Sequence, residues 1–195
     1  ALYENNFAWT ANKRIQNYQC DIENGEILTN AQARNEGVLL LFRHSIFLEL
    51  SARLISERFD IYGMERPNNN AAIQKLQQKG RLKAMKGLTA NSNVNQLINW
   101  LNEGKTVLYG PDQDYRNKRS VVSKFFNKPC LTTTVPFNLQ KITGCKLIYL
   151  DFYATENGYK FILRDVSEIT KSKQEFADRI NEIIEKSINI APEHY

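Results

Sequence analysis

One short apolar run, Val38 to Phe42, constrains the fold more than any other feature of the chain. It follows Gly37 and is interrupted at once by Arg43 and His44. A run this short and continuous is typical of a strand that is buried on both faces. The following stretch, 46–59, carries apolar residues at helical spacing. A buried strand that leads directly into an amphipathic helix predicts an α/β fold.

The rest of the chain continues this alternation of short apolar runs and amphipathic stretches. Further strands are expected at 60–64, 105–109, 146–153 and 159–163, the last two joined by a turn at 156–158. Further helices are expected at 70–79, 93–102 and 171–188, with Pro67 opening the first and Gly80 and Gly104 ending the first two. Residues 132–143 are expected to be a strand end leading into a helix, and 113–128 a loop over a site. We therefore predict one α/β domain over residues 1–195, with a mixed central sheet flanked by helices and an amphipathic segment at 1–20.

Amino-acid composition excludes few of the possible functions. The net charge of +5 suits nucleic acid, an anionic membrane or an acidic carrier protein equally well. The odd number and the wide spacing of the three cysteines fit neither a disulfide framework nor a zinc site. No stretch approaches the roughly 20 apolar residues that a membrane span needs.

His44 and Glu49 are the strongest candidates for catalysis. His44 follows a predicted buried strand, and catalytic groups in α/β sheets gather at the carboxyl ends of strands. If His44 lies in the loop and Glu49 on the first helical turns, Glu49 can hydrogen-bond one ring nitrogen while the other takes a proton from a hydroxyl. The alternative is a partly buried histidine satisfied by the backbone, with Glu49 as a solvated helix residue.

Further sequence blocks resemble one protein family, in the family's order. His44-x4-Glu49 after Gly37 resembles the first block of the glycerolipid acyltransferase superfamily, and the remaining blocks resemble the late acyltransferases of lipid A biosynthesis. These blocks are Arg66-Pro67-Asn68, 78–81, 109–115, 120–126, 132–134 and 191–195. Two positions depart from the family pattern. Arg116-Asn117 stand where Gly-Pro is usual, and His194 stands where glutamine is usual.

The resemblance implies a glycerol-3-phosphate acyltransferase-like fold and an O-acyltransferase that needs no cofactor and no metal. It implies transfer of a fatty-acyl group from acyl-acyl carrier protein to a hydroxyl of a 3-hydroxyacyl chain on a lipid A precursor. The implied location is the inner (cytoplasmic) membrane, with the catalytic domain on the cytoplasmic face and in contact with anionic lipid, not nucleic acid. An N-terminal membrane anchor and a C-terminal end are expected to be missing from this chain.

The resemblance also implies roles for particular residues. His44 would be the general base, Glu49 would orient it, and Arg81 would stabilise the oxyanion or bind a phosphate. Asp112 and Gln113 are expected to support the catalytic loop, with a magnesium site at Asp112 and Asp114 as an alternative. Other substrate-binding candidates are Arg66, Asp114, Arg116, Lys118, Arg119, Phe125, Phe126 and Thr133, the two phenylalanines in an acyl tunnel with Phe47, Leu48 and Leu50. Each has a plainer interpretation as an ordinary helix-end, loop, strand or core residue.

Two other functions stay open. A related membrane acyltransferase could act on a glycolipid such as phosphatidylinositol mannoside, or on glycerol phosphate. Glycerol-phosphate enzymes usually carry Pro-Glu-Gly-Thr-Arg where this chain has 110–114, which argues against the second acceptor. The chain could instead be an inert basic module that binds membrane or nucleic acid. Its aromatic residues fall mostly in apolar runs, which argues against nucleic acid.

Overall fold

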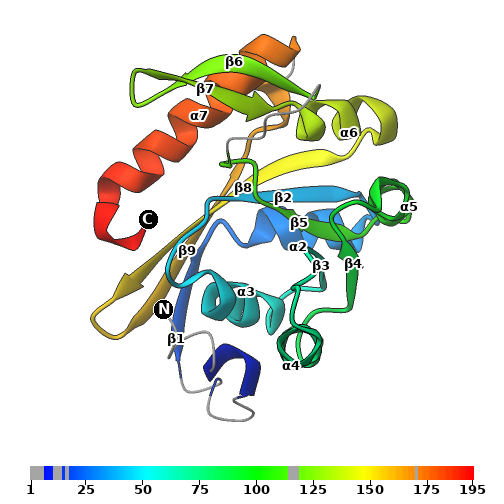
Figure 1. Cartoon of the computed structure of the whole chain (residues 1–195), viewed down its shortest axis with the longest axis vertical. Helices are drawn as coiled ribbons and strands as arrows, with labels where there is room; N and C mark the ends of the chain where they lie inside the picture. Colours follow the sequence, from blue (N-terminus) through cyan, green and yellow to red (C-terminus); the bar gives the residue numbers. More distant parts are fainter. Residues whose placement is uncertain (1–6, 11–14, 16–17, 114–118, 170) are drawn as a thin grey trace.

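A mixed β-sheet forms the centre of the computed structural model, which describes residues 7–10, 15, 18–113, 119–169 and 171–195 (Figure 1). Within these residues the sheet has seven strands in the order β1-β9-β8-β2-β5-β3-β4. They are β1 (Gln19–Glu23), β2 (Val38–Phe42), β3 (Ile61–Glu65), β4 (Gly87–Ala90), β5 (Thr106–Tyr109), β8 (Lys146–Thr155) and β9 (Gly158–Asp165). β8 and β9 pair antiparallel, whereas the other neighbours pair parallel. The predicted α/β fold with a mixed central sheet is confirmed.

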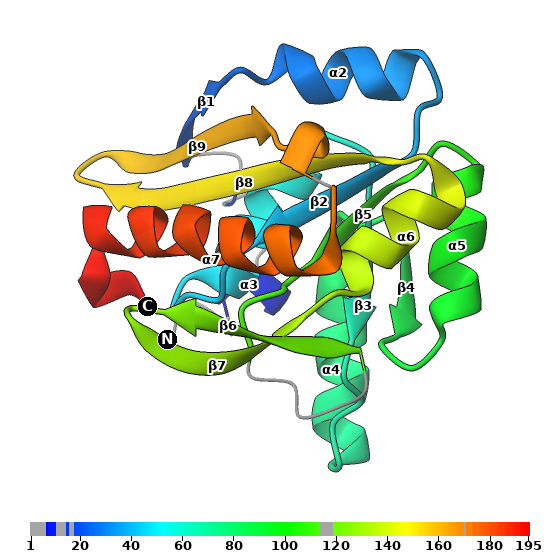
Figure 2. The same ribbon diagram turned by 90° about the horizontal axis from the view of Figure 1, so that it is seen from above.

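Helices cover both faces of this sheet (Figures 1 and 2). α2 (Glu26–Ala33) and α3 (Leu48–Ser56) pack on one face, and α4 (Ala71–Arg81) lies beside α3. α5 (Val94–Asn102), α6 (Val135–Thr143) and α7 (Lys173–Ile190) pack on the other face. A separate hairpin of β6 (Ser120–Phe125) and β7 (Lys128–Thr133) lies on α7, and short 3₁₀ helices occupy Ser167–Ile169 and Pro192–His194. None of the helices in the described ranges is long and apolar enough to cross a membrane.

The central strand β2 explains why its sequence is continuously apolar. Successive side chains of a strand point to opposite faces. Leu40 therefore joins the core beneath α2 and α3, whereas Leu39 and Leu41 join the core beneath α5, α6 and α7. All three are fully buried. Burial on both faces confirms the interpretation of this run as a central strand.

The prediction of a loop over 113–128 is wrong for its second half, where β6 begins at Ser120. β6 lies on α7 outside the main sheet, so most of its side chains are partly or fully exposed and it lacks an apolar pattern. Ser123 is the buried residue of this strand, and its hydroxyl donates to Asp178 of α7 at 2.6 Å. The strand is therefore held by polar contacts that hydrophobic patterning does not detect.

The boundaries of α4 also differ from the prediction. The helix begins at Ala71, after Asn70 caps it by accepting hydrogen bonds from two backbone N–H groups. It runs through Gly80, which was expected to end it, to Arg81. A Cβ at Gly80 would lie 2.5 Å from Cβ of Trp9, so this glycine allows the N-terminal segment to pack against the helix. A contact from distant sequence explains the glycine better than a helix stop.

Sequence patterns did not predict β1, α2 or β4. β1 and β4 are the two edge strands, and neither contains a fully buried residue. In α2 only Leu28 and Ala31 are buried, which leaves a weak helical signal. The three cysteines, all in the described part of the chain, are free thiols.

Candidate active site

The side chains of His44 and Asp112 meet at the carboxyl edge of the sheet. β2 and β5 are parallel neighbours in which Leu41 pairs with Tyr109. His44 follows Leu41 by three residues (41 to 44), and Asp112 follows Tyr109 by three residues (109 to 112). Equal spacing from a register pair places both side chains just beyond the strand ends, where α/β folds usually form their sites.

Two close contacts hold His44 on Asp112. The backbone N–H of His44 donates to Oδ2 of Asp112 at 2.6 Å, and ring Nδ1 lies 2.6 Å from Oδ1. The carboxylate is fully buried, whereas the imidazole side chain keeps 39% of its exposure. A carboxylate at Nδ1 favours the tautomer that carries its proton there, which leaves the Nε2 lone pair facing outward as a base.

The electrostatics of this pair favour a protonated ring. Burial of the imidazole lowers its pKa, but the hydrogen bond and the negative charge of Asp112 outweigh burial. The net effect raises the pKa of His44 above its ordinary value of 6.5. A raised pKa makes the neutral ring a stronger base near neutral pH.

Gly110 and Gln113 complete the surroundings of the ring. A Cβ at Gly110 would lie 2.9 Å from Cε1 of His44, so only glycine leaves room for the imidazole here. The Gln113 side-chain nitrogen lies 3.2 Å from Nε2 of His44. An acceptor hydroxyl that reaches Nε2 must therefore displace the amide of Gln113.

Glu49 does not hydrogen-bond the ring of His44, in contrast to the sequence prediction. Both oxygens of its carboxylate bind the guanidinium of Arg81, through Nη2 and through Nε at 3.1 Å. The indole N–H of Trp9 also donates to this carboxylate at 2.8 Å. Helix geometry explains the correction, because Glu49 on the first turn of α3 faces α4, whereas His44 faces the end of β5.

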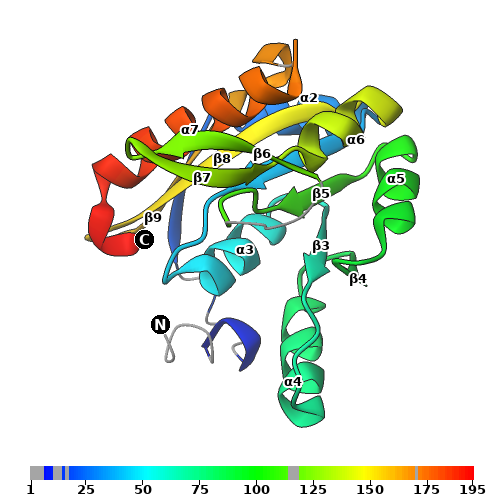
Figure 3. The same cartoon turned by 45° about the horizontal axis from the view of Figure 1, so that its top comes forward.

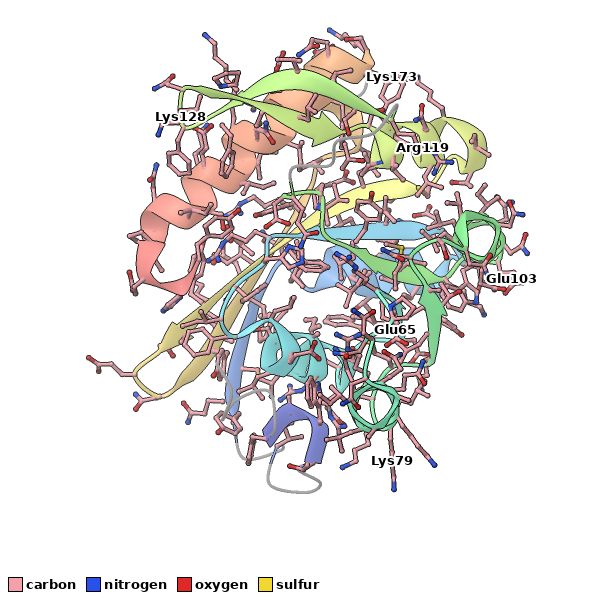
Figure 4. All side chains as sticks on the ribbon, in the orientation of Figure 1. Glu65, Lys79, Glu103, Arg119, Lys128 and Lys173 are labelled. Atoms are coloured by element: carbon pink, nitrogen blue, oxygen red, sulfur yellow. The ribbon has the colours of Figure 1, made fainter. Side chains whose placement is uncertain are left out.

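Arg81 belongs to an ion cluster that lies between α3, α4 and β3. Its Nη1 donates to Glu65 at 3.1 Å, and the amides of Gln74 and Gln78 donate to the other oxygen of Glu65 at 2.5 Å. The side chains of Glu49, Glu65 and Arg81 are 12%, 3% and 17% exposed. The label on Glu65 in Figure 4 marks where this cluster lies within the molecule.

The pKa values in this cluster shift in the direction that keeps it ionised. Burial raises the pKa of Glu49, but the hydrogen bonds and charge of Arg81 reverse this effect, and the net result is a lowered pKa. Burial likewise opposes the charge on Arg81, yet its two glutamates raise its pKa overall. Both shifts favour the charged forms of Glu49 and Arg81.

A third set of charges, which sequence reasoning missed, lies behind the loop that carries His44. The fully buried guanidinium of Arg43 donates to the Ser187 hydroxyl at 2.7 Å and to the carbonyl of His44 at 3.4 Å. The Ser187 hydroxyl in turn donates to Asp151, which Arg164 neutralises at 2.7 Å. The signal for this role was the position of Arg43, a charge directly after a strand buried on both faces.

One cavity joins the His44 site to the ion cluster. Its volume is about 560 Å³, within the range usual for small-molecule sites. Its polar wall includes His44, Glu49, Arg66, Arg81, Asn91 and Gln113. Its apolar wall includes Phe42, Leu48, Met85, Leu88, Leu108 and Phe152. The cavity thus offers a base beside a hydrocarbon-lined space.

The other predicted site residues fall into two groups. Arg66 and Gln113 line the cavity, as does Leu48 of the expected acyl tunnel. Arg119, Phe125, Phe126 and Thr133 do not line it, because they belong to the β6–β7 hairpin and its surroundings. Asp114, Arg116 and Lys118 lie outside the described residues.

The hairpin residues have other contacts. Phe125 packs against Phe126 and Tyr195, with ring centroids 5.0 and 6.4 Å apart. The backbone carbonyl of Arg119 accepts hydrogen bonds from Thr134. The Thr133 hydroxyl accepts from the backbone N–H of Val135 at 3.3 Å, at the start of α6. These contacts connect the hairpin to α6 and to the C-terminal residues.

Among the residues that the structure describes, no group of three histidine, cysteine, aspartate or glutamate side chains could hold a metal ion. Both oxygens of Asp112 already contact His44. The pairing of Asp112 with the His44 backbone and ring suits proton transfer by an oriented imidazole.

The sequence matches one protein family and several of its curated members. The family model described as bacterial lipid A biosynthesis acyltransferase matches residues 1–195. The lipid A biosynthesis palmitoleoyltransferase of Escherichia coli (strain K12) is 30% identical over 200 residues, and the lauroyltransferase of the same strain is 31% identical over 200 residues. Each match covers 100% of this chain and 65% of the relative. A lipid A biosynthesis acyltransferase of Haemophilus influenzae is 31% identical over 197 residues, covering 96% of this chain and 62% of that protein. The chain thus spans less than two thirds of the length of these relatives.

Proposed function

The chain belongs to the bacterial lipid A biosynthesis acyltransferase family, and on that premise we propose that it transfers a fatty-acyl group from acyl-acyl carrier protein to a hydroxyl of a 3-hydroxyacyl chain on a lipid A precursor. The observation that carries this proposal is the pairing of His44 with buried Asp112 beside a cavity with polar and hydrocarbon walls. The relatives named for palmitoleoyl and lauroyl transfer support the reaction class.

The reaction needs one proton to move twice. Nε2 of His44 takes the proton of the acceptor hydroxyl as its oxygen bonds to the thioester carbonyl carbon. The tetrahedral intermediate then breaks its carbon–sulfur bond, and the proton on Nε2 goes to the departing sulfur to give a thiol and the new ester. Asp112 accepts the Nδ1 hydrogen bond throughout and stabilises the imidazolium between the two steps.

Glu49 and Arg81 have a different role in this proposal. Three N–H groups of Arg81 are occupied by the carboxylates of Glu49 and Glu65. One guanidinium between two carboxylates leaves little positive charge for an oxyanion. We therefore assign Glu49 and Arg81 to shaping the cavity wall and positioning polar substrate groups, with the exposed Arg66 as the better candidate for a phosphate.

We also propose that α4 rests on an anionic membrane, with the catalytic domain on the cytoplasmic face of the inner membrane. Residues 71–86 contain four lysines and no acidic residue. Ile73 and Leu76 of α4 are 44% and 42% exposed. The positive charges of Arg53 and Lys79, after burial itself, lower the pKa of Lys83, as expected where cations crowd together. α4 projects from the lower end of the molecule (Figure 3), while its inner face lines the cavity, so a lipid acceptor could enter from the membrane.

Vesicle co-sedimentation tests this membrane contact. Reversing Lys75 and Lys79 to glutamate should weaken binding to anionic vesicles by about 10-fold or more, since each lysine near such a surface contributes about 1 kcal/mol. A matched control reverses Lys128 and Lys173, which lie at the opposite end of the molecule (Figure 4). Equal loss in both double variants, or equal binding to neutral vesicles, would contradict the proposal.

An acyl-transfer assay tests the main proposal. The protein is incubated with acyl-acyl carrier protein and a lipid A precursor, and the product is identified by mass spectrometry. We expect one added acyl group per transfer in the parent protein and none above background in His44→Ala, whose circular dichroism spectrum should remain that of the folded parent. Glycolipid and glycerol-phosphate acceptors are assayed beside the lipid A precursor. Transfer to one of these two acceptors alone would show that the protein is a related acyltransferase. No turnover on any acceptor would favour the inert basic module that binds membrane or nucleic acid.

A further inference from the structure

The apolar part of the cavity runs across the strands of the sheet. Its lining comes from five neighbouring strands in spatial order, with Phe152 on β8, Phe42 on β2, Leu108 on β5, Gly63 on β3 and Leu88 on β4. Neighbouring strands are about 4.8 Å apart, so the path from β8 to β4 is about 19 Å long. His44 follows β2, the second of these five strands, so most of the path lies between the base and β4. One arm of the cavity therefore extends from the base toward the edge strand β4.

Gly63 forms a recess in the wall of this arm. Along β3, Ile61, Gly63 and Glu65 point to the same face of the sheet. Ile61 is part of the closed core, and Glu65 holds Arg81, so the missing side chain at Gly63 opens space between an apolar and a polar group. Glycine within a strand often marks a place where a ligand or another chain approaches closely.

Two flexible side chains face this recess and close the arm at β4. A Cβ at Gly63 would lie 2.8 Å from Sδ of Met85 and 2.9 Å from Cδ2 of Leu88. Met85 is 8% exposed and lines the cavity. Both contacts involve the far ends of side chains, which can move without disturbing the backbone.

We propose that this arm holds the hydrocarbon chain of the donor and that Gly63, Met85 and Leu88 form the floor that limits its length. The inference rests on the proposed acyl transfer and adds the specificity determinant of the same site. The floor excludes a chain that would have to push Met85 or Leu88 out of their packed positions. A shorter chain leaves apolar surface unfilled and gains less binding.

The expected discrimination follows from the size of the hydrocarbon contact. One methylene in an apolar pocket changes the specificity constant by about 10-fold or more. An added methyl at Gly63 pushes Met85 and Leu88 into the cavity and shortens the arm. Removing the side chain of Met85 lengthens it. The two substitutions therefore act in opposite directions on the same selectivity.

A competition experiment measures this selectivity directly. The protein receives an equimolar mixture of saturated acyl-acyl carrier proteins that differ by two carbons, together with the lipid A precursor. Product ratios by mass spectrometry give the ratio of kcat/KM for each pair of chain lengths. Gly63→Ala should shift the preferred chain to a shorter one, and the ratio of longer to shorter product should fall about 10-fold. Met85→Ala should shift the ratio by about 10-fold in the other direction.

Two variants on the opposite face of the sheet serve as matched controls. Gly87 on β4 pairs with Tyr62, and a Cβ there would lie 2.9 Å from the ring of Tyr62, in the other core. Gly87→Ala is therefore a comparable glycine substitution outside the cavity. Leu97 of α5 is buried in that other core, so Leu97→Ala matches the packing loss of Met85→Ala. Both controls should keep the product ratios of the parent protein.

The outcomes separate the floor from the reaction itself. Active Gly63→Ala and Met85→Ala variants with the parent's product ratios would overturn the floor while leaving acyl transfer intact. The floor would also be contradicted if the control variants shifted the product ratios as much as the test variants. A parent protein that transfers no acyl group from any donor would instead overturn the proposed function.

Discussion

Two carboxylates occupy opposite electrostatic settings: Asp112 lies behind the cavity residue His44, and Glu49 lies in the cavity wall. Asp112 is fully buried and contacts one partly exposed imidazole, whose pKa it raises. Glu49 lies in a cluster with Arg81, Glu65 and Trp9, where its lowered pKa keeps it charged. The Asp112–His44 pair can therefore exchange a proton, whereas the cluster around Glu49 has a structural role.

The comparison shows that the two ends of His44-x4-Glu49 serve different structures. His44 belongs to the loop after β2 and meets the loop after β5, while Glu49 belongs to α3 and meets α4. Closeness in sequence therefore does not decide which carboxylate orients the base. Substitutions at the two carboxylates should separate chemistry from stability.

The largest difference is expected in the rate of acyl transfer. Asp112→Asn removes the charge that stabilises the imidazolium, so kcat should fall about 10²–10⁴-fold, the usual contribution of positioned acid–base catalysis. Glu49→Gln keeps a hydrogen-bond acceptor for Trp9 and should lower kcat much less. Initial rates at saturating donor measure both. A larger loss of kcat in Glu49→Gln than in Asp112→Asn would return the orienting role to Glu49.

Loss of the Glu49 carboxylate should also lower the free energy of unfolding. Glu49→Ala leaves the guanidinium of Arg81 with one carboxylate and the indole of Trp9 without its acceptor. Removing one partner of a buried ion pair typically costs about 3 kcal/mol. Urea unfolding followed by circular dichroism measures this loss. Glu182→Ala, which breaks an exposed pair with Arg179, should cost less than about 1 kcal/mol. Similar losses in the two variants would mean that the cluster contributes no more than a surface pair.

The pH dependence of kcat/KM distinguishes the two carboxylates again. A general base must be neutral, so activity falls as pH drops through the pKa of His44, and a raised pKa places that fall above 6.5. Asp112→Asn should move the acidic limb to lower pH, because Asp112 is the group that raises this pKa. Glu49→Gln should leave the limb in place.

Stability should follow the same pKa with its own sign. Protonation of His44 is favoured in the fold, so its stabilising contribution is complete below pH 6.5 and is lost as pH rises through the raised pKa. The difference in unfolding free energy between the parent protein and Asp112→Asn, measured against pH, should shrink over that interval. A difference that does not change with pH would contradict the assigned pairing.

The sequence predicted the parts of the fold whose signals are local. The central strands β2 and β5, the hairpin of β8 and β9, and helices α3, α5 and α7 carry apolar periodicity or turn residues within their own segments. The edge strands and the β6–β7 hairpin depend on pairing or on polar contacts to α7, so they lack such signals. Gly80 was misread because its neighbour is Trp9, far away in the chain.

In the site, too, local sequence predicted the positions of residues but not their partners. Placing His44 and Asp112 at the carboxyl edge of the sheet required only that each follow a buried strand. Their contact required knowing that β2 and β5 are neighbours and that Leu41 pairs with Tyr109. The pairing of Glu49 with Arg81 required the angle between α3 and α4, which no spacing encodes. Partner choice among nearby charges is thus a property of tertiary structure.

The smallest expected effect concerns Trp9, which connects the N-terminal segment to the cluster. Trp9→Phe removes the indole N–H that donates to Glu49 at 2.8 Å while keeping an aromatic ring against Gly80. A hydrogen bond to a charged group contributes about 1.5 kcal/mol, so the loss should be about half that of Glu49→Ala. Urea unfolding followed by the fluorescence of the remaining Trp100 measures it. Acyl transfer should persist, because Arg81 still holds both oxygens of Glu49. A loss as large as that of Glu49→Ala would mean that the indole, and not the guanidinium, organises the cluster.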